Sequence, residues 1–321
     1  MTRTASAPSA SLKPPNPPTV SIVVPAYDEA ENMADLFSEL ADMLRTSHLN
    51  AEVILVDDGS GDGTLEAARQ AAATAELERV TLLQHRRNRG KTEALLTASR
   101  TASGEYLVLF DADLQHATEE IPRFVEKLEE GYDVVAGRKV GRYEKRTVSA
   151  IYNWMCRRLF RVEVHDLNAM KAFRRGILDE LQLRSDWHRY LVVLAHARGF
   201  RVTEIEIRLF PRRHGASKYK GRRRILVGML DLLAVWFQLL FSRKPMLFFG
   251  VTGLAVLGLG AVIGLAALYL RFGLQQGYRP LLSLVVLLVV VGLLLFAVGF
   301  LAELIASLRS EVEEMRRERG T

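Results

Sequence analysis

The chain has 321 residues, a formal net charge of +6 and a hydrophobic fraction of 49%. This length allows a full α/β domain together with a smaller part. The only cysteine is Cys156, which excludes a disulfide framework within the chain and fits a reducing compartment. Basic residues concentrate between Arg138 and Lys244, next to an apolar C-terminal third and without interleaved surface aromatic residues. This arrangement favours a membrane surface or a phosphate-bearing partner and argues against nucleic acid.

The N-terminal segment is rich in Ser, Ala and Pro over its first 18 residues. It contains no apolar core of the length that a signal peptide needs, and its composition is typical of unfolded segments. We therefore expect a disordered tail over residues 1–18, followed by a soluble domain over residues 19–221.

Short β-branched runs alternate with helical stretches through the first half of this domain. The expected strands are Val20–Pro25, Val53–Val56, Val80–Leu83, Tyr106–Phe110 and Val134–Ala136. The expected helices are Glu29–Arg45, an alanine-rich stretch after the second strand, Lys91–Ala102 and Glu119–Glu130. Strands that alternate with helices predict an α/β fold with a doubly wound, mostly parallel sheet.

The segment 222–244 is apolar between two basic clusters, Arg222–Arg224 and Arg243–Lys244. Its two polar residues, Asp231 and Gln238, lie seven positions apart and share one helical face. Lys and Arg prefer the cytoplasmic side of a membrane, so a helix with basic residues at both ends is poorly suited to cross. We expect a juxtamembrane amphipathic helix that lies in the interface, with a third span as the alternative.

Two uncharged runs follow, Pro245–Leu270 and Pro280–Ala302. Each is long enough to span a hydrocarbon core of roughly 30 Å. They predict two transmembrane helices within residues 245–303, followed by a charged cytoplasmic helix over residues 304–321. The turn between them carries only Arg271 and Arg279, whereas the flanks carry more basic residues. We therefore expect an integral membrane protein, in the plasma membrane if bacterial, whose soluble domain lies in the cytoplasm.

Two carboxylates, Asp111 and Asp113, flank Ala112 directly after the fourth expected strand. Their repulsion would strain the fold unless a cation or hydrogen-bond donors lay between them. Hard divalent ions prefer oxygen ligands and leave coordination positions for substrate phosphates, and Gln115 adds a neutral oxygen. The sequence therefore predicts a divalent metal, Mg²⁺ or Mn²⁺, that could bridge diphosphate oxygens.

Polar motifs also follow the first three expected strands. They are Pro25-Ala26-Tyr27-Asp28-Glu29, Asp57-Asp58-Gly59-Ser60 and Asn88-Arg89-Gly90-Lys91. Taken singly, each could be a turn or a helix cap. Ligands of parallel sheets bind at the carboxyl ends of the strands, so the four motifs together predict one binding site at that edge.

The ordered set Val-Val-Pro-Ala-Tyr-Asp-Glu, Val-Asp-Asp-Gly-Ser, Asn-x-Gly-Lys and Asp-Ala-Asp-Leu-Gln-His resembles family 2 glycosyltransferases of the GT-A fold. Within that family it is most similar to the polyprenyl-phosphate glycosyltransferases, the group that contains dolichol-phosphate mannose synthase. The resemblance runs from Val20 to the second span. It implies a donor that is a UDP- or GDP-linked sugar and an acceptor that is a polyprenyl phosphate lipid, and it leaves a homo-oligomer open.

The resemblance also implies roles for matching positions. The nucleotide-sugar-binding residues would be Pro25, Ala26, Tyr27, Glu29, Asp57, Asp58, Lys91, Asp111, Ala112 and Asp113. The metal ligands would be Asp111 and Asp113, assisted by Gln115. Asp166 and Asn168 would lie near the sugar, but the segment that follows Asp166 departs from the mannose synthases and leaves the donor sugar open.

A second set of positions matches the family's acceptor-binding residues. The segment from Arg212 to Lys218 resembles its Arg-x-x-Gly-x-Ser-Lys run near the membrane. The residues implied to bind the acceptor phosphate are Arg138, Arg146, Ser149, Arg212, Ser217 and Lys218. Those implied to take part in catalysis are Asp111, Asp113, Arg138, Arg212 and Lys218.

The expected reaction needs no dedicated general base. A phosphate monoester has a second pKa of about 6 and is mostly dianionic at neutral pH. We expect one direct displacement that inverts the anomeric carbon, while metal and cations stabilise the leaving nucleotide diphosphate. One alternative is a processive polysaccharide synthase of the same fold, although the Gln-x-x-Arg-Trp segment of those enzymes is missing. Another is a non-catalytic nucleotide-sugar-binding membrane component, which would not need the carboxylate pair.

Overall fold

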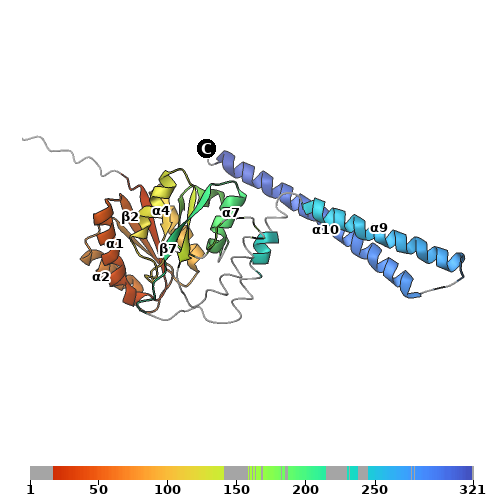
Figure 1. Ribbon diagram of the computed structural model, residues 1–321, viewed down its shortest axis with the longest axis horizontal. Helices are drawn as coiled ribbons and strands as arrows, with labels where there is room; N and C mark the ends of the chain where they lie inside the picture. Colours follow the sequence, from red (N-terminus) through yellow and green to blue (C-terminus); the bar gives the residue numbers. More distant parts are fainter. Residues whose placement is uncertain are drawn as a thin grey trace, which may run out of the picture. The chain divides into compact units, whose positions relative to one another are not determined.

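The computed structural model describes residues 17–140, 158–214 except 159, 161, 163, 168, 182, 185 and 186, residues 230 and 232–237, and residues 245–319 except 276 and 278. The chain divides into two compact units, Met1–Arg224 and Ile225–Thr321 (Figure 1).

The first unit is built on a single mixed sheet. Its described strands are β1 (Val20–Ala26), β2 (Ala51–Asp57), β3 (Val80–Gln84), β4 (Tyr106–Leu109), β5 (Val134–Val140), β6 (Lys171–Arg174) and β7 (Val202–Arg208). Their order across the sheet is β3-β2-β1-β4-β6-β5-β7. All neighbouring pairs are parallel except those of β6, which runs antiparallel to β4 and β5. The prediction of a doubly wound, mostly parallel sheet is confirmed.

Helices cover both faces of this sheet (Figure 1). One core contains Val20, Ile22 and Val24 of β1, and it is covered by α1 (Met33–Ser47), α2 (Thr64–Thr74) and α4 (Glu120–Glu129). Val23 is equally buried but points to the other face, because successive strand residues alternate. There α3 (Lys91–Thr101) packs on β1 and β2, and α7 (Leu191–Ala197) packs on β5 and β7. Burial on both faces explains why β1 is apolar at every position except Ser21.

The order of the strands creates a crevice between β1 and β4. From β1 the chain adds β2 and β3 on one side, and it then crosses to the other side to add β4. The connections after β1 and β4 therefore leave the carboxyl edge in opposite directions, which opens a space between them. Both the segment after Ala26 and the carboxylate pair after Phe110 begin at this point.

Three parts of the first unit differ from the sequence-based expectation: two strands, the start of the first helix and the segment before α7. The strands β6 and β7 were not predicted, and β6 supplies the antiparallel member. The first helix begins at Met33, after the short 3-10 turn η1 (Ala30–Asn32), rather than at Glu29. Two short helical turns, α6 (Ile177–Glu180) and η2 (Trp187–Tyr190), precede α7.

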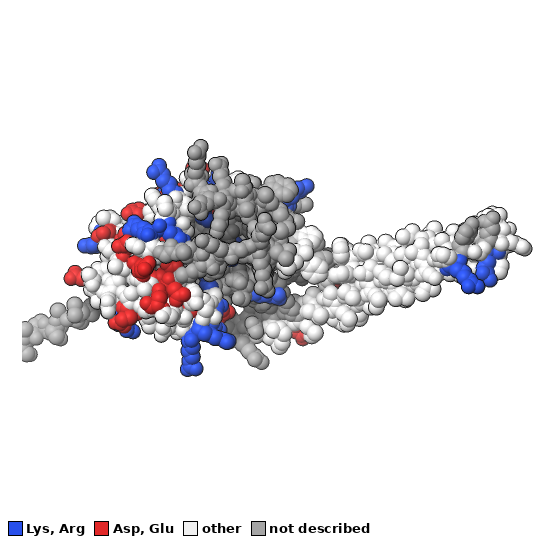
Figure 2. All heavy atoms as spheres, turned by 90° about the horizontal axis from the view of Figure 1, so that it is seen from below, with Lys and Arg blue, Asp and Glu red and all other residues white. Residues whose placement is uncertain are grey.

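The second unit contains two long helices, α9 (Pro245–Phe272) and α10 (Arg279–Arg319). Both are long and apolar enough to cross a membrane. Figure 2 shows almost no charged side chain along the pair and a basic group at one end. Arg271 lies in the last turn of α9, and Arg279 is the first residue of α10. The charged segment after residue 303 is not a separate element, because α10 continues through it to Arg319. These helices indicate a membrane protein.

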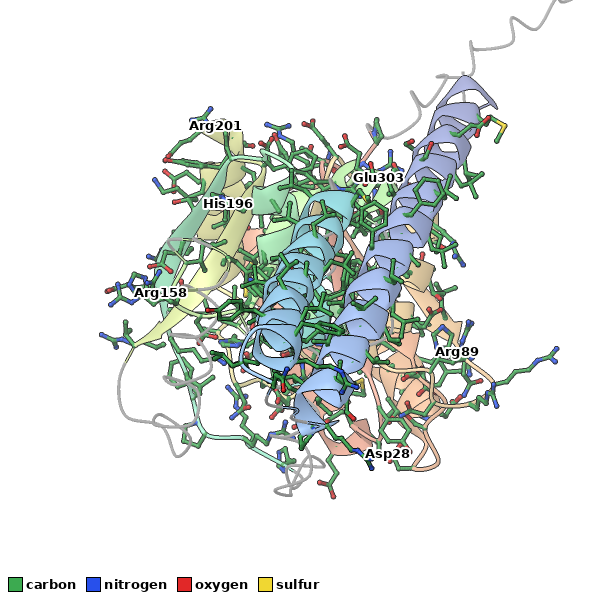
Figure 3. All side chains as sticks on the ribbon, turned by 90° about the vertical axis from the view of Figure 1, so that its right-hand side faces the viewer. Asp28, Arg89, Arg158, His196, Arg201 and Glu303 are labelled. Carbon is green, nitrogen blue, oxygen red and sulfur yellow. The ribbon has the colours of Figure 1, made fainter. Side chains whose placement is uncertain are left out.

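Small residues bring α9 and α10 close together. A Cβ atom added to Gly253 would lie 2.8 Å from the carbonyl oxygen of Gly292, and one added to Gly292 would lie 2.9 Å from that of Gly253. A second contact joins the start of α9 to α10. Glu303 of α10, labelled in Figure 3, accepts a hydrogen bond from the Met246 backbone N–H at 3.1 Å. This carboxylate satisfies one of the N–H groups that a helix start leaves without an intrahelical partner.

The expected juxtamembrane helix lies largely outside the described residues. Residues 230 and 232–237 are helical, and Leu232 and Val235 among them are buried. The two basic clusters around the segment, Arg222–Arg224 and Arg243–Lys244, fall in the part that the structure does not describe.

Candidate active site

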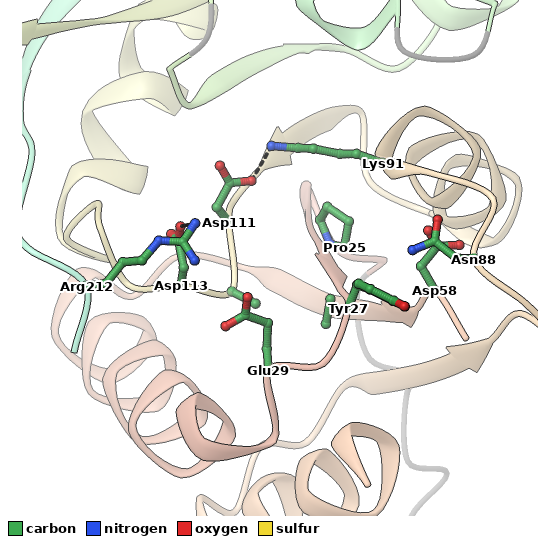
Figure 4. A pocket seen from close by; sticks show the side chains of 11 residues that line it. Pro25, Tyr27, Glu29, Asp58, Asn88, Lys91, Asp111, Asp113 and Arg212 are labelled. Atoms are coloured by element: carbon green, nitrogen blue, oxygen red, sulfur yellow. Dashed lines mark hydrogen bonds and ion pairs between the residues drawn. The ribbon is translucent and has the colours of Figure 1, made fainter. Parts of the chain in front are cut away.

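A pocket lies at the carboxyl ends of β1, β2 and β4. Its lining residues are Pro25, Ala26, Tyr27, Glu29, Asp58, Asn88, Lys91, Asp111, Ala112, Asp113 and Arg212 (Figure 4). All of them except Asn88 were proposed from the sequence as site residues. The four sequence motifs therefore meet in one place, because the sheet brings together the ends of parallel strands.

The loop after β1 is fixed by the loop after β2. Asp28 has a φ of 49°, a left-handed conformation that Asp tolerates better than most residues. Its backbone N–H donates to Ser60 Oγ at 2.8 Å, and its carboxylate accepts from the Gly61 N–H at 2.9 Å. The Glu29 N–H donates to Thr64 Oγ1 at 2.9 Å. These bonds hold the Tyr27–Glu29 wall of the pocket without using the side chain of Tyr27.

Asp58 organises the loop between β3 and α3. Its carboxylate accepts hydrogen bonds from the Arg89 N–H at 2.9 Å and the Gly90 N–H at 2.7 Å. The ring of His85 binds the same carboxylate through Nδ1 at 2.7 Å. Asp58 is 4% exposed, so these donors offset the cost of burying its charge. This loop leads directly into α3, whose first residue, Lys91, lines the pocket.

Lys91 forms an ion pair and hydrogen bond with Asp111 across the pocket (Figure 4). Burial by itself raises the pKa of Asp111, but the charge of Lys91 and its hydrogen bond outweigh that effect, so the pKa lies well below its usual range. Asp111 is therefore ionised at neutral pH. A carboxylate that stays charged is the form that a divalent cation requires.

Asp113 is buried beside Asp111 and pairs with Arg212, whose Nη2 lies 2.7 Å from Oδ2. Burial raises the pKa of Asp113, and the negative charge of Asp111 raises it further; Arg212 opposes both effects only in part. The net result is a pKa above the ordinary value. The two carboxylates thus carry an electrostatic cost that a divalent cation between them would relieve.

The carboxylate pair fits a divalent metal of the Mg²⁺ or Mn²⁺ type. Such ions are often held by one or two carboxylates and complete their coordination with water and substrate phosphates. Among the described residues, no cluster of three or more His, Cys, Asp or Glu side chains could hold a metal by itself. If Asp111 and Asp113 hold a metal, water and a phosphate-bearing substrate would supply further ligands.

Four of the described candidate residues, Asp57, Gln115, Arg138 and Asp166, lie outside the pocket lining. Asp166 is buried, and its Oδ2 lies 3.6 Å from Lys139 Nζ. Asp57 uses its carboxylate within the protein, accepting from the Ser60 N–H at 3.0 Å and from Gln84 Nε2 at 2.9 Å. Gln115 donates through Nε2 to the Phe210 carbonyl oxygen at 3.4 Å, which leaves Oε1 as the atom able to bind a metal. Arg138 lies in β5.

The guanidinium of Arg138 faces two acidic residues of the neighbouring strand β7. Its Nη1 lies 3.8 Å from Glu204 Oε1 and 3.7 Å from Glu206 Oε1. An anionic ligand at Arg138 would therefore compete with these carboxylates. The remaining residues implied to bind the acceptor phosphate, Arg146, Ser149, Ser217 and Lys218, lie outside the described residues, as does Asn168.

Sequence reasoning missed two features of the site. Asn88 lines the pocket, and its place in the Asn-x-Gly-Lys run was the signal that could have identified it. Lys171 of β6 is 2% exposed and donates to the Ala169 carbonyl oxygen at 3.0 Å. Burial, reinforced by the nearby charge of Lys91, lowers its pKa to about 7. No periodic pattern marked β6 as a strand, so the burial of this lysine was not foreseeable.

The seven-stranded mixed sheet resembles the GT-A fold of glycosyltransferases. Solved structures support the fold: glucosyl-3-phosphoglycerate synthase from Mycobacterium tuberculosis in complex with Mg²⁺ and uridine diphosphate matches with a TM-score of 0.54. That match has 19% sequence identity and covers 67% of this chain and 79% of the other. The same enzyme has also been solved with Mn²⁺, UDP-glucose and phosphoglyceric acid.

The model of glycosyl transferase family 2 matches residues 21–201, and the chain belongs to this family. An undecaprenyl-phosphate 4-deoxy-4-formamido-L-arabinose transferase from Aeromonas hydrophila subsp. hydrophila is 30% identical, covering 93% of this chain and 91% of the relative. A dodecaprenyl-phosphate galacturonate synthase from Rhizobium johnstonii is 33% identical, covering 89% and 87% respectively. Both alignments extend beyond the family domain and include most of the second unit.

Proposed function

We propose that this glycosyltransferase moves a sugar from a nucleotide diphosphate sugar to a membrane polyprenyl phosphate, with inversion at the anomeric carbon. The product is a lipid-linked monosaccharide that serves later glycosylation. The names of the two relatives support the acceptor class, since both specify polyprenyl phosphates. The single observation that carries the proposal is the ionised Asp111 beside Asp113 in the pocket of a chain that also has two membrane-length apolar helices.

The reacting groups need little help from a protein base. The acceptor phosphate is mostly dianionic at neutral pH, and one of its oxygens attacks the anomeric carbon while the bond to the diphosphate breaks. Negative charge then accumulates on the leaving diphosphate. Lys91 and Arg212 reach the pocket from opposite walls and can offset that charge. When bound, a divalent metal on Asp111 and Asp113 supplies further Lewis-acid stabilisation of the diphosphate.

The wall residues would position the donor. Tyr27 is 36% exposed and presents an aromatic ring to the pocket, which suits stacking on a nucleobase. Glu29 and Asn88 add hydrogen-bonding groups nearby (Figure 4). For the acceptor phosphate, Arg138, Arg146, Ser149, Arg212, Ser217 and Lys218 stay the proposed partners.

The proposed topology places both ends of the helix pair on the cytoplasmic side. Only Arg271 and Arg279 flank the short turn between α9 and α10, whereas many basic residues precede Pro245 and follow Glu303. Since Lys and Arg accumulate on the cytoplasmic side, the glycosyltransferase unit would face the cytoplasm, where nucleotide sugars would be its donors.

The test is to incubate the purified full-length enzyme with polyprenyl phosphate, Mn²⁺ or Mg²⁺ and a panel of radiolabelled UDP- and GDP-sugars. Label entering the organic phase as a monosaccharide conjugate is the expected result, and it identifies the donor. Label in a long polymer would instead favour a processive synthase. Donor binding without transfer from any sugar would favour a non-catalytic component and would overturn the proposal.

A further inference from the structure

Arg212 belongs to a short segment without regular secondary structure that follows β7, residues 209–214, which we call the strap. The strap is tied to the metal motif by one backbone hydrogen bond and one side-chain hydrogen bond. The Phe210 N–H donates to the Gln115 carbonyl oxygen at 2.8 Å, and the Gln115 side chain donates back to the Phe210 carbonyl at 3.4 Å. Two residues further on, Arg212 reaches Asp113 (Figure 4).

The next residue of the strap points to a different element. Arg213 Nη2 lies 2.5 Å from Glu39 Oε1, and Nη1 lies 3.4 Å from Asp35 Oδ2. Asp35 and Glu39 both belong to α1 and are four residues apart, so they share one face of the helix. Two like charges at this spacing repel each other, and Arg213 between them removes that repulsion.

The same part of α1 is also joined to the loop that follows the metal motif. Thr118 is fully buried, and its hydroxyl donates to the Glu39 carbonyl oxygen at 3.3 Å. The helix surface that receives Arg213 is therefore held in register with the segment that contains Asp111 and Asp113. A strap anchored on this surface keeps a fixed position relative to the two carboxylates.

A simple stabilising role does not account for this contact. Arg213 is 48% exposed, and its partners Asp35 and Glu39 are 43% and 26% exposed; ion pairs this accessible to solvent contribute little to stability. The ion pairs of Arg213 instead fix the direction in which the strap runs past the carboxylates. Because Arg212 and Arg213 are adjacent, anchoring one on α1 determines where the other can reach.

We propose that Arg213 is a positioning residue: its bridge to Asp35 and Glu39 holds the strap so that Arg212 faces the metal-diphosphate site. This inference rests on the proposed function, since it assigns Arg212 to the nucleotide diphosphate. Arg213 contributes no atom to the reaction and acts through the position of Arg212.

The test compares charge variants of the full-length enzyme purified in detergent. Arg213→Glu and Glu39→Arg each break the bridge and place like charges together, whereas the double variant R213E/E39R restores it in reverse. Arg45→Glu is the matched control, because Arg45 forms an exposed ion pair with Asp42 on the same helix at 2.5 Å but contacts no strap residue in the described part of the chain. It changes the net charge by the same amount as Arg213→Glu.

The readout is calorimetric binding of Mn²⁺ with UDP and with GDP, together with kcat/KM for the donor sugar. Each single variant should weaken binding of the preferred nucleotide roughly tenfold, and the double variant should return to within about threefold of wild type. Arg45→Glu should bind as wild type does. Raised salt should weaken nucleotide binding in wild type and in the Arg213→Glu variant, but the gap between them should narrow, because screening weakens the bridge.

Several outcomes would overturn the proposal. Binding by Arg213→Glu equal to that by Arg45→Glu would do so, as would a double variant no better than the single ones. If Arg213→Glu fails to fold, Glu39→Arg and the double variant still decide the question. If the wild-type enzyme binds a nucleotide but transfers no sugar to lipid, the proposed function alone is wrong. If it binds neither UDP nor GDP, both the proposed function and the positioning role of Arg213 are wrong.

Discussion

Arg212 Nη2 and Asp113 Oδ2 lie 2.7 Å apart, although Asp113 follows the central strand β4, Arg212 follows the edge strand β7, and the two residues are separated by 99 positions in the chain. Both residues line the pocket, where the guanidinium lies against the carboxylate (Figure 4). The positive charge of Arg212 lowers the pKa of Asp113, which burial and the charge of Asp111 raise. The same cation can therefore offset the negative charge of the carboxylate pair and contact the diphosphate of a bound donor.

Replacing Arg212 with Ala should lower kcat/KM for the donor by roughly a hundredfold, the effect of removing one preorganised donor from developing charge. Arg212→Lys should recover only part of this loss, because an ammonium cannot reproduce the fork of a guanidinium. Steady-state transfer to polyprenyl phosphate measures both. If the lysine variant equalled wild type, a simple charge effect would explain the residue. Wild-type activity of Arg212→Ala would remove it from the site.

Replacing Asp113 with Asn keeps the side-chain shape but removes a charge from the proposed metal site. We expect activity to fall at least roughly a hundredfold and the concentration of Mn²⁺ needed for half-maximal rate to rise. Asp42→Asn, on the exposed face of α1, is the matched control and should change neither quantity. Titration of Mn²⁺ in the transfer assay distinguishes the two. Full activity of the Asp113→Asn enzyme would contradict the assignment of this carboxylate.

The parallel half of the fold could be predicted from the sequence because each strand carries its own signal. The β-branched run at Val20–Ala26 is buried on both faces, and the Asp-Ala-Asp motif directly follows β4. Local patterns of this kind locate strand ends, and the geometry of parallel sheets then gathers those ends into one site. This is why ten of the pocket residues were found without a structure.

The remainder depends on contacts that no local pattern encodes. The four residues of β6 include Lys171, and a charged residue in so short a segment does not predict a buried strand. The bridge from Arg213 to Asp35 joins exposed residues 178 positions apart, and surface charges occur throughout the sequence. The sequence predicted a membrane span that ends at residue 303 and a separate charged helix after it. The structure has one helix, α10, and residues 303–319 contain neither Gly nor Pro that would end it. Charge can mark the end of a membrane span without ending the helix.

The packing of α9 on α10 predicts different tolerance at two glycines of one helix. Gly253→Val should destabilise the helix pair, because its Cβ would lie 2.8 Å from the backbone oxygen of Gly292. Gly258→Val is the control, since a Cβ there meets nothing within 4 Å. Thermal unfolding in detergent should show a lower midpoint for the first variant only. Equal midpoints would mean that close backbone approach does not hold the pair together.

The proposed topology can be tested with single cysteines in a Cys156→Ser background. A cysteine at Gly277, in the turn between α9 and α10, should react with a membrane-impermeant maleimide added outside intact cells. A cysteine at exposed Ser310, beyond the apolar part of α10, should react only after the membrane is opened. The reverse pattern would place the glycosyltransferase unit on the outer face and contradict the proposed cytoplasmic orientation.

Burial lowers the pKa of Lys171 to about 7, and Lys91 adds to this effect, whereas an unfolded chain keeps the ordinary value near 10.5. Between these two pH values the unfolded state binds more protons than the folded state, so Lys171 makes stability rise with pH across that window.

Lys171→Met keeps the length of the side chain and removes the charge. The variant should gain stability over wild type most at pH 7 and progressively less toward pH 10. Thermal unfolding of both proteins at several pH values measures this difference, and a gap independent of pH would show that Lys171 is not held in its neutral form.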